Sequence, residues 1–144
     1  MYLIFDTETT GLPKNWNAPL TDFDNWPRMV QLAWQLHDIK GELLEVKNFI
    51  IKPEGFDIPF NAQKIHGIST AIADSQGIAL DQVLEEFLND LQRSKFLVGH
   101  NVKFDINIVG CELLRKEKQN SLNDFSIIDT KNESTDFCAL PGGK

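Results

Sequence analysis

The 144-residue sequence contains only two cysteines, Cys111 and Cys138, which lie far apart and outside any CxxC pattern. Two such residues supply too few ligands for a zinc site. Nothing in the sequence indicates secretion, so reduced thiols are expected rather than a disulfide. We therefore expect both cysteines to pack as small apolar side chains.

The sequence also lacks long apolar runs and a cleavable leader. Its apolar runs are only a few residues long, far below the roughly 20 residues that a membrane-spanning helix needs. Residues 1–6 show neither the basic region nor the small-residue cleavage site of a signal peptide. A cytoplasmic location is therefore the default expectation.

An excess of basic residues is absent as well, and the formal net charge is −7. This charge counts against a protein that grips duplex DNA through a broad basic face. It does not exclude an enzyme that acts on one strand end, because cations held by clustered carboxylates create a local positive site. Length and composition fit one globular domain over residues 1–144.

Hydrophobic patterning predicts five strands and two long helices. Residues 2–5 are continuously apolar, which is typical of a central strand covered on both faces. A loop rich in Pro, Asn and Asp follows over residues 13–27. The remaining predicted elements are strands over 29–36 and 46–52 with a hairpin at Lys40-Gly41, an amphipathic helix over 80–91, a strand over 96–99, a helix over 104–118 and a strand over 125–128. This order predicts an α/β domain with a mixed five-stranded sheet flanked by helices.

Two acids stand at the end of the first predicted strand. Asp6 and Glu8 are two residues apart, so the alternation of strand side chains places both carboxylates on one side of the sheet. Such a pair suits a hard divalent cation, Mg²⁺ or Mn²⁺. Gly11, shortly after them, would allow a tight turn close to a ligand. For these two acids alone, a strand end that caps a turn is the alternative.

A third acid, Asp105, falls in the first turn of the helix predicted after the fourth strand. If the first and fourth strands are parallel neighbours, their carboxyl ends meet where ligands bind in open α/β sheets. Asp105 would then face Asp6 and Glu8. An acid is also favourable at a helix N-terminus, and both roles can hold together.

Three segments carry a resemblance to a known family. They are residues 5–12 (FDTETTGL), residues 65–69 (IHGIS) and residues 100–105 (HNVKFD). Their sequences and their order resemble those of the DnaQ-like (DEDDh) 3′–5′ exonucleases, a family that includes the epsilon proofreading subunit of DNA polymerase III. The three matches are spread over most of the chain.

The resemblance implies a ribonuclease H-like fold and hydrolysis of single-stranded DNA from its 3′ end in proofreading or repair. It also implies two ions, Mg²⁺ or Mn²⁺, one activating water and the other steadying the leaving oxygen. Asp6 would contact both ions, Glu8 one of them, and Asp105 would support the second through water. A DNA polymerase subunit is an implied partner, and RNA stays open as a substrate because the motifs do not resolve contacts to the 2′-OH.

The resemblance also indicates residues that contact the terminal nucleotide. Leu12, His66 and Phe104 match such positions, and an apolar wedge beside an aromatic face suits stacking against any base. Ordinary packing is the alternative for Leu12 and Phe104. His66 is either a substrate contact or a hydrogen-bonded structural residue.

Other polar residues of the motifs are assigned more simply. Thr7 and Thr9 are candidates for binding substrate, and Asn101 would contact the sugar or fix the strand-to-helix turn. We expect His100 to be structural, and His37 has no functional context.

Three aromatic residues, Trp16, Phe23 and Trp26, stand out in the polar loop over residues 13–27. They could form a stacking platform for single-stranded DNA or a surface for a partner. Anchoring of a long loop to the domain is the favoured interpretation.

One part of the family pattern is absent. Members complete the site with a further helix that carries a histidine, the general base, and an aspartate that binds metal. No histidine follows His100, and residues 140–144 show no helical pattern. The acids beyond the second long helix are not assigned to catalysis; they are Asp124, Asp129 and Asp136. We therefore expect one domain without its last helical segment, with exposed sheet or helix surface and weak or no activity.

Two hypotheses remain open. The first is an exonuclease domain that needs the missing segment for activity. The second is a catalytically silent module that binds a polymerase subunit or a strand end. The trio of Asp6, Glu8 and Asp105 argues against the second, because a binding module has no physical need for three mutually repelling acids.

Overall fold

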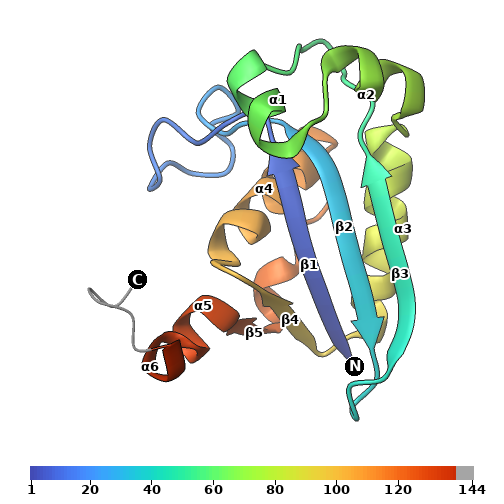
Figure 1. Cartoon of the computed structure of the whole chain (residues 1–144), viewed down its shortest axis with the longest axis vertical. Helices are drawn as coiled ribbons and strands as arrows, with labels where there is room; N and C mark the ends of the chain where they lie inside the picture. Colours follow the sequence, from blue (N-terminus) through green and yellow to red (C-terminus); the bar gives the residue numbers. More distant parts are fainter. Residues whose placement is uncertain (139–144) are drawn as a thin grey trace.

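A computed structural model describes residues 1–138 and contains a five-stranded sheet with the order β3-β2-β1-β4-β5 (Figure 1). Strands β1 (Tyr2–Thr9), β2 (Met29–His37) and β3 (Leu43–Ile50) form an antiparallel meander. Strand β4 (Phe96–Gly99) is parallel to β1, and β5 (Ser126–Asp129) is parallel to β4. The predicted α/β class and the mixed five-stranded sheet are confirmed.

Two long helices, α3 (Leu80–Arg93) and α4 (Lys103–Arg115), agree with the prediction. The shorter helices were not predicted; they are α1 (Phe60–His66), α2 (Thr70–Gln76), the 3-10 helix η1 (Leu122–Asp124), α5 (Thr130–Glu133) and α6 (Thr135–Cys138). None of these helices in residues 1–138 is long and apolar enough to cross a membrane.

Helix α1 depends on local signals that hydrophobic periodicity does not reveal. Pro59 precedes it with a φ of −60°, which suits entry into a helix. Gly67 ends it at a φ of 81°, a left-handed conformation that glycine adopts without steric cost. With only seven residues and one buried side chain, α1 has no apolar stripe for a sequence pattern to detect.

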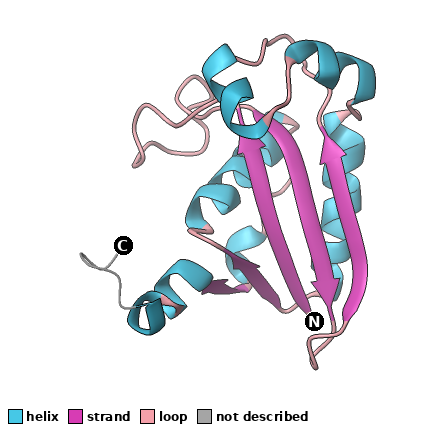
Figure 2. Cartoon of the chain, in the orientation of Figure 1, coloured by secondary structure: helices cyan, strands magenta, loops and turns pink. Residues whose placement is uncertain are grey.

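The sheet is covered on one face only within the described residues. Leu3, Phe5 and Thr7 are buried under α3 and α4, whereas Ile4 and Asp6, which alternate with them, are exposed. The other face of β1, β2 and β3 is uncovered (Figure 2). The prediction that β1 is covered on both faces is therefore wrong, because both long helices pack on the same side.

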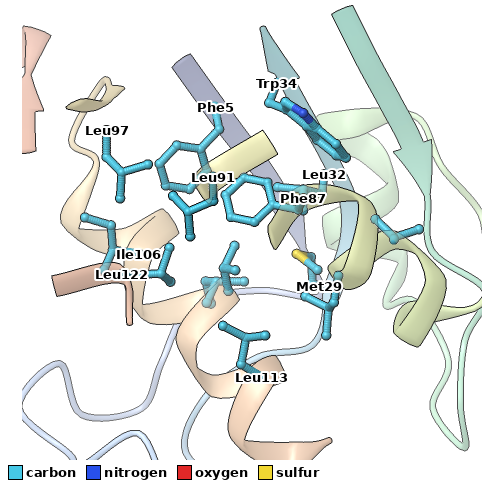
Figure 3. Packing of buried hydrophobic residues seen from close by; sticks show 14 of the residues in the cluster. Phe5, Met29, Leu32, Trp34, Phe87, Leu91, Leu97, Ile106, Leu113 and Leu122 are labelled. Atoms are coloured by element: carbon cyan, nitrogen blue, oxygen red, sulfur yellow. The ribbon is translucent and has the colours of Figure 1, made fainter. Parts of the chain in front are cut away.

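The main core fills the space between the covered face and the two long helices (Figure 3). Phe5 and Trp34 from neighbouring strands both contact the ring of Phe87 from α3, with centroid distances of 5.5 and 5.4 Å. Leu97, Ile106 and Leu113 extend the same cluster towards β4 and α4. Burial of this continuous apolar surface is the main force that fixes α3 and α4 on the sheet.

Strand β1 is longer than its apolar run. Pairing with β2 continues as far as Thr9, opposite Met29, with an irregular register between Glu8 and Thr9. Backbone hydrogen bonding depends on main-chain groups, so the ladder extends beyond the hydrophobic residues. As a result, Asp6 and Glu8 lie within the strand and not in the loop after it.

The two cysteines differ in environment. Cys111 is buried in the core, as predicted, and burial raises the pKa of its thiol to about 11. Cys138 is exposed at the end of α6, so the prediction that it packs in the interior is wrong. Neither forms a disulfide, as expected. Residues 140–144, for which the sequence predicts no helix, lie outside the described residues.

A buried acid connects α3 to the sheet. Asp90 accepts a hydrogen bond from Trp34 Nε1 at 2.8 Å and forms ion pairs with Lys47 and Arg93, each at 2.9 Å. Burial opposes ionisation of Asp90, but the hydrogen bonds from Trp34 and Lys47 outweigh it and keep its pKa below the usual value. The helix is thereby joined to both β2 and β3.

We predict that Asp90→Ala lowers the free energy of unfolding by about 3–5 kcal/mol, because it leaves the Trp34 indole and the Lys47 ammonium without their buried partner. Urea denaturation measures this change. The control is Asp81→Ala on the same helix, which removes an exposed ion pair with Lys116 and should cost less than about 1 kcal/mol. Equal losses of unfolding free energy in the two variants would contradict the role of Asp90 as a buried link between α3 and the sheet.

Candidate active site

The carboxylates of Asp6 and Glu8 lie on the open face of the sheet. Their partners across the antiparallel ladder are Ala33 and Gln31, and directly paired residues share a face. Asp6 is exposed and Glu8 is half-buried. The predicted placement of both acids on one side of the sheet is therefore confirmed.

Asp105 approaches the same strand from the covered face. Its Oδ1 accepts hydrogen bonds from the backbone N–H of Thr7 at 2.9 Å and from the Thr7 hydroxyl at 2.6 Å. Thr7 stands between Asp6 and Glu8, but its side chain points to the opposite side of the sheet. The parallel pairing of β1 with β4 brings the first turn of α4 to this point, as predicted.

This geometry corrects two predictions. Asp105 does not face Asp6 and Glu8 directly, because α4 packs on the covered face and its acid meets Thr7 first. The Thr7 hydroxyl, expected to bind substrate, is buried and already donates to Asp105. Thr7 therefore holds Asp105 in place behind the two acids.

The pKa of each of the three acids is raised above its ordinary value. Burial raises the pKa of Asp6, and His100 opposes this rise. Burial also raises the pKa of Glu8, with a further rise from the charge of Asp6 and an opposing effect of His66. Burial raises the pKa of Asp105 to about 6, against the hydrogen bonds from Thr7 and with help from the charge of Asp6. Bound positive charge would favour the ionised forms of these acids.

His66 is the last residue of α1, a helix that lies beside the carboxyl end of β1 (Figure 1), and its charge acts on Glu8. Its Nδ1 accepts a hydrogen bond from the backbone N–H of Ile68 at 3.1 Å. The neutral ring therefore carries its proton on Nε2, which is buried and has no hydrogen-bond partner among the described residues. The hydrogen bond from Ile68 is the structural role considered for His66. Its Nε2–H is free to donate to another group.

His100 belongs to the site more closely than the sequence suggested. It lines a hollow of about 440 Å³ on the open face together with Asp6, Gln35 and Thr130. Its Nδ1 lies 3.2 Å from the Thr130 hydroxyl, which itself donates to the Gly99 carbonyl oxygen at 3.1 Å.

The proton arrangement of His100 follows from this chain of contacts. When the Thr130 hydroxyl donates its only proton to Gly99, it can only accept from His100, and the neutral ring then holds its proton on Nδ1. This tautomer leaves Nε2 as a hydrogen-bond acceptor. No signal in the sequence pairs His100 with Thr130, since that contact needs β4 and β5 side by side.

The remaining motif residues come from the end of β1, the loop after it, the turn between β4 and α4, and the start of α4. Leu12 is 71% exposed, Phe104 is half-buried, and the Thr9 hydroxyl donates to the Gly11 carbonyl oxygen at 2.7 Å. Gly11 has a φ of 154°, which supports the predicted tight turn. Asn101 has a left-handed φ of 59°, and its N–H donates to Asp129 at 2.9 Å, which favours the turn-fixing alternative.

The three loop aromatics separate into different roles. Trp26 is buried and donates from Nε1 to the Pro19 carbonyl oxygen at 3.1 Å, so it anchors the loop as favoured. Phe23 lies under the guanidinium of Arg115. Trp16 is half-exposed and contacts the Phe104 ring, with 5.7 Å between centroids.

The donor set fits a divalent cation in part. Asp6 and Glu8 offer hard oxygen ligands that are not neutralised by a salt bridge within the described residues. In residues 1–138, however, no three His, Cys, Asp or Glu side chains come together as a metal-binding group. Mg²⁺ is commonly held by one or two carboxylates with substrate phosphates, so two acids suffice for an incomplete site of this kind.

Comparison with known proteins identifies the family. The family model described as Exonuclease (RNase_T) matches residues 3–135, nearly the whole chain. The chain belongs to the exonuclease family. The resemblance in residues 5–12, 65–69 and 100–105 is thereby confirmed.

Curated relatives within this family are DNA polymerase III epsilon subunits. The subunit from Rickettsia felis is 32% identical over 132 residues, which are 89% of this chain and 52% of the relative. The subunit from Buchnera aphidicola subsp. Acyrthosiphon pisum is 33% identical over 131 residues, 89% of this chain and 51% of the relative. The chain thus spans about half the length of the curated relatives it matches.

Solved exonuclease structures share the fold. E. coli exonuclease I in complex with an oligonucleotide matches 97% of this chain and 30% of its own, with a TM-score of 0.76 and 21% identity. The zinc-bound form of the E. coli exonuclease I complex with single-stranded DNA has a TM-score of 0.78 and 22% identity, with the same coverage. These matches confirm the predicted ribonuclease H-like fold.

We predict that the metal-free protein loses stability as the pH rises from about 4 to above 6. The pKa of Asp105 is about 6 in the fold against 3.8 when unperturbed, so the folded chain binds more protons than the unfolded chain in this window. The free energy of unfolding then falls with pH, by on the order of 3 kcal/mol in total. Urea denaturation in EDTA across this range should show a flatter profile for Asp105→Asn. An unchanged profile in that variant would contradict the assignment.

Proposed function

We propose that this chain is a metal-dependent 3′–5′ exonuclease domain that acts on single-stranded DNA ends in proofreading or repair. The main support for this proposal is that Asp6 and Glu8 lie together on the open face of the sheet. The chain that carries them belongs to the exonuclease family. The epsilon relatives support a replicative role with a DNA polymerase subunit as partner. The solved neighbours that contain single-stranded DNA support the substrate class.

Asp6 and Glu8 would hold the metal, as two ions of Mg²⁺ or Mn²⁺. Bound there, these ions would supply an activated water and neutralise charge on the leaving oxygen. Asp105, fixed by Thr7 behind the strand, would support the site through water. The raised pKa values of Asp6 and Glu8 support this role, since both acids gain from nearby positive charge.

Residues around the acids would bind the strand end. Leu12 and Phe104 would contact the bases, because stacking and apolar contact tolerate any sequence. His66 Nε2–H and the unprotonated His100 Nε2 would make hydrogen bonds to the terminal nucleotide. Thr9 and Asn101 border the same end of the sheet and would complete the contacts to the sugar and phosphate.

Full activity would need a further segment. In residues 1–138 the two open-face acids lack a third ligand, and a histidine and an aspartate from a further helix would complete the set. Such a helix would pack on the open face, where Ile4 and Val46 expose apolar surface beside the hollow that Asp6 and His100 line. We therefore expect this chain alone to cleave weakly.

A catalytically silent binding module is the second candidate. The lack of a three-ligand group in the described residues favours it. The hydrogen bonds that hold Asp105 behind Asp6 and Glu8 disfavour it, because binding alone has no need of a held acid there.

We predict that divalent cations stabilise the chain through the two acids. Ions that bind only the folded state raise its apparent stability. Millimolar Mn²⁺ should therefore raise the thermal unfolding midpoint of the parent but not of an Asp6→Asn, Glu8→Gln variant. Glu42→Gln, at an exposed position in the turn between β2 and β3, beside the start of β1, should respond like the parent. Equal shifts in all three proteins would contradict the metal assignment.

We predict 3′-end shortening of 5′-labelled single-stranded DNA with Mn²⁺. The Asp6→Asn, Glu8→Gln variant should be at least about a hundredfold slower, since even partners of metal ligands often matter 10–100-fold. Denaturing gels with single-nucleotide resolution measure the rate. Shortening from the 5′ end, or an undiminished rate in the variant, would contradict the proposal.

The response to a longer chain separates the two candidates. Extension beyond Lys144 along the reading frame, with a histidine and an aspartate in the added segment, should raise the cleavage rate of an otherwise weak chain. An extended chain that still binds DNA but cleaves nothing would favour the silent module.

A further inference from the structure

We infer that Trp16 is a base-stacking residue of the substrate site, and that it holds one unpaired nucleobase near the 3′ end. This inference rests on the proposed function and adds to it a residue outside the three family motifs. Four features of the loop and of α4 support it.

The first feature is the position of the ring. Trp16 contacts Phe104 with 5.7 Å between ring centroids and an interplanar angle of 51°. Phe104 immediately precedes Asp105, whose carboxylate is bonded to Thr7 between the two metal-binding acids. The indole is therefore connected to β1, the strand that carries Asp6 and Glu8, through Phe104 and its neighbour Asp105.

The second feature is exposure. Trp16 is 50% exposed, whereas Trp26 of the same loop is 3% exposed and Trp34 of β2 is 2% exposed. An indole that served only to anchor the loop would be buried like Trp26. The exposed part of the Trp16 ring is a flat apolar surface of the kind on which unpaired bases stack.

The third feature is the chemistry beside the ring. Trp16 and Phe104 line a slot of about 140 Å³ together with three asparagines and a lysine; these are Asn17, Asn101, Asn107 and Lys103. In the described part of the chain, no hydrogen bond takes up the side-chain amides of the three asparagines. Amides can pair with the edges of a base and the ammonium group with a phosphate, so the slot suits a nucleotide better than an apolar side chain.

The fourth feature is the rigidity of the support. Asn15, next to Trp16, donates its N–H to Asn25 Oδ1 at 2.7 Å and receives a hydrogen bond on its carbonyl oxygen from Asn25 Nδ2 at 3.0 Å. Arg115 of α4 donates to the carbonyl oxygens of Phe23 and Trp26 at 2.7 and 2.8 Å. The loop is thus tied to α4, so Trp16 meets a base with little further loss of conformational entropy.

Binding of a 5′-labelled oligothymidylate, protected by 3′ phosphorothioate linkages, tests the inference by fluorescence anisotropy. Loss of one stacking contact weakens binding by roughly five- to a hundredfold. We expect Trp16→Ala to bind about tenfold more weakly and Trp16→Phe to keep most of the affinity. Ile39→Ala, which removes an exposed apolar residue from the β2–β3 turn, should bind like the parent.

An abasic scan shows whether the lost contact is to a base. Oligonucleotides with one abasic site at each of the last four positions are bound to the parent and to Trp16→Ala. When the abasic site is at one particular position, Trp16→Ala should reduce the binding affinity by only about twofold or less, because the base that would stack on Trp16 is already absent. A loss of the same size on every oligonucleotide, or no loss on the intact one, would overturn the inference.

The outcomes separate this inference from the proposed function. A parent that shows the Trp16-dependent abasic effect, together with an extended chain that cleaves no DNA, keeps the inference and removes the exonuclease activity. A parent that cleaves DNA while Trp16→Ala binds normally keeps the activity and removes the inference. A parent that binds no single-stranded DNA overturns both.

Discussion

The two hydrogen bonds from Thr7 to Asp105 are the contact on which the site depends. Through them, the first turn of α4 is fixed to β1 at the residue between Asp6 and Glu8. They hold Asp105 in a buried position. Burial raises the pKa of its carboxyl group to about 6, so its ionised form is disfavoured there. Stability alone does not explain this arrangement, because a buried carboxylate such as that of Asp105 opposes folding at neutral pH. Positive charge bound nearby would favour the ionised forms of Asp6, Glu8 and Asp105.

The two faces of the sheet carry different kinds of side chains. On the covered face, α3 and α4 bury Phe5, Trp34 and Phe87. On the open face, β1 presents Ile4, Asp6 and Glu8. One strand thus contributes alternately to the core and to the site, and the same alternation that buries Thr7 exposes its two acidic neighbours. The long β1–β2 loop is tied to α4 and places Trp16 against Phe104.

The sequence predicted the site in outline, and the structure corrected how its parts meet. Asp6, Glu8 and Asp105 were recognisable from their positions at element ends and from the family motifs. The orientation of Asp105 could not be predicted, because a spacing pattern does not show which face of the sheet α4 covers. His100 was expected to be structural, and it does contact Thr130, but the sequence could not name this partner because the contact needs β4 and β5 side by side. Helices α1 and α2 were missed because short helices without an apolar stripe give no periodic signal.

The sequence by itself determined the order of the strands and long helices, the common side of Asp6 and Glu8, and the family. These follow from local rules, namely side-chain periodicity and short motifs, which do not depend on distant parts of the chain. Only the tertiary structure decided that one face of the sheet stays open among the described residues, that Thr7 holds Asp105, and that Trp16 lies against Phe104. Each of these results from packing between segments far apart in the chain, and the free energy of such packing is set by burial in three dimensions, which no local pattern encodes.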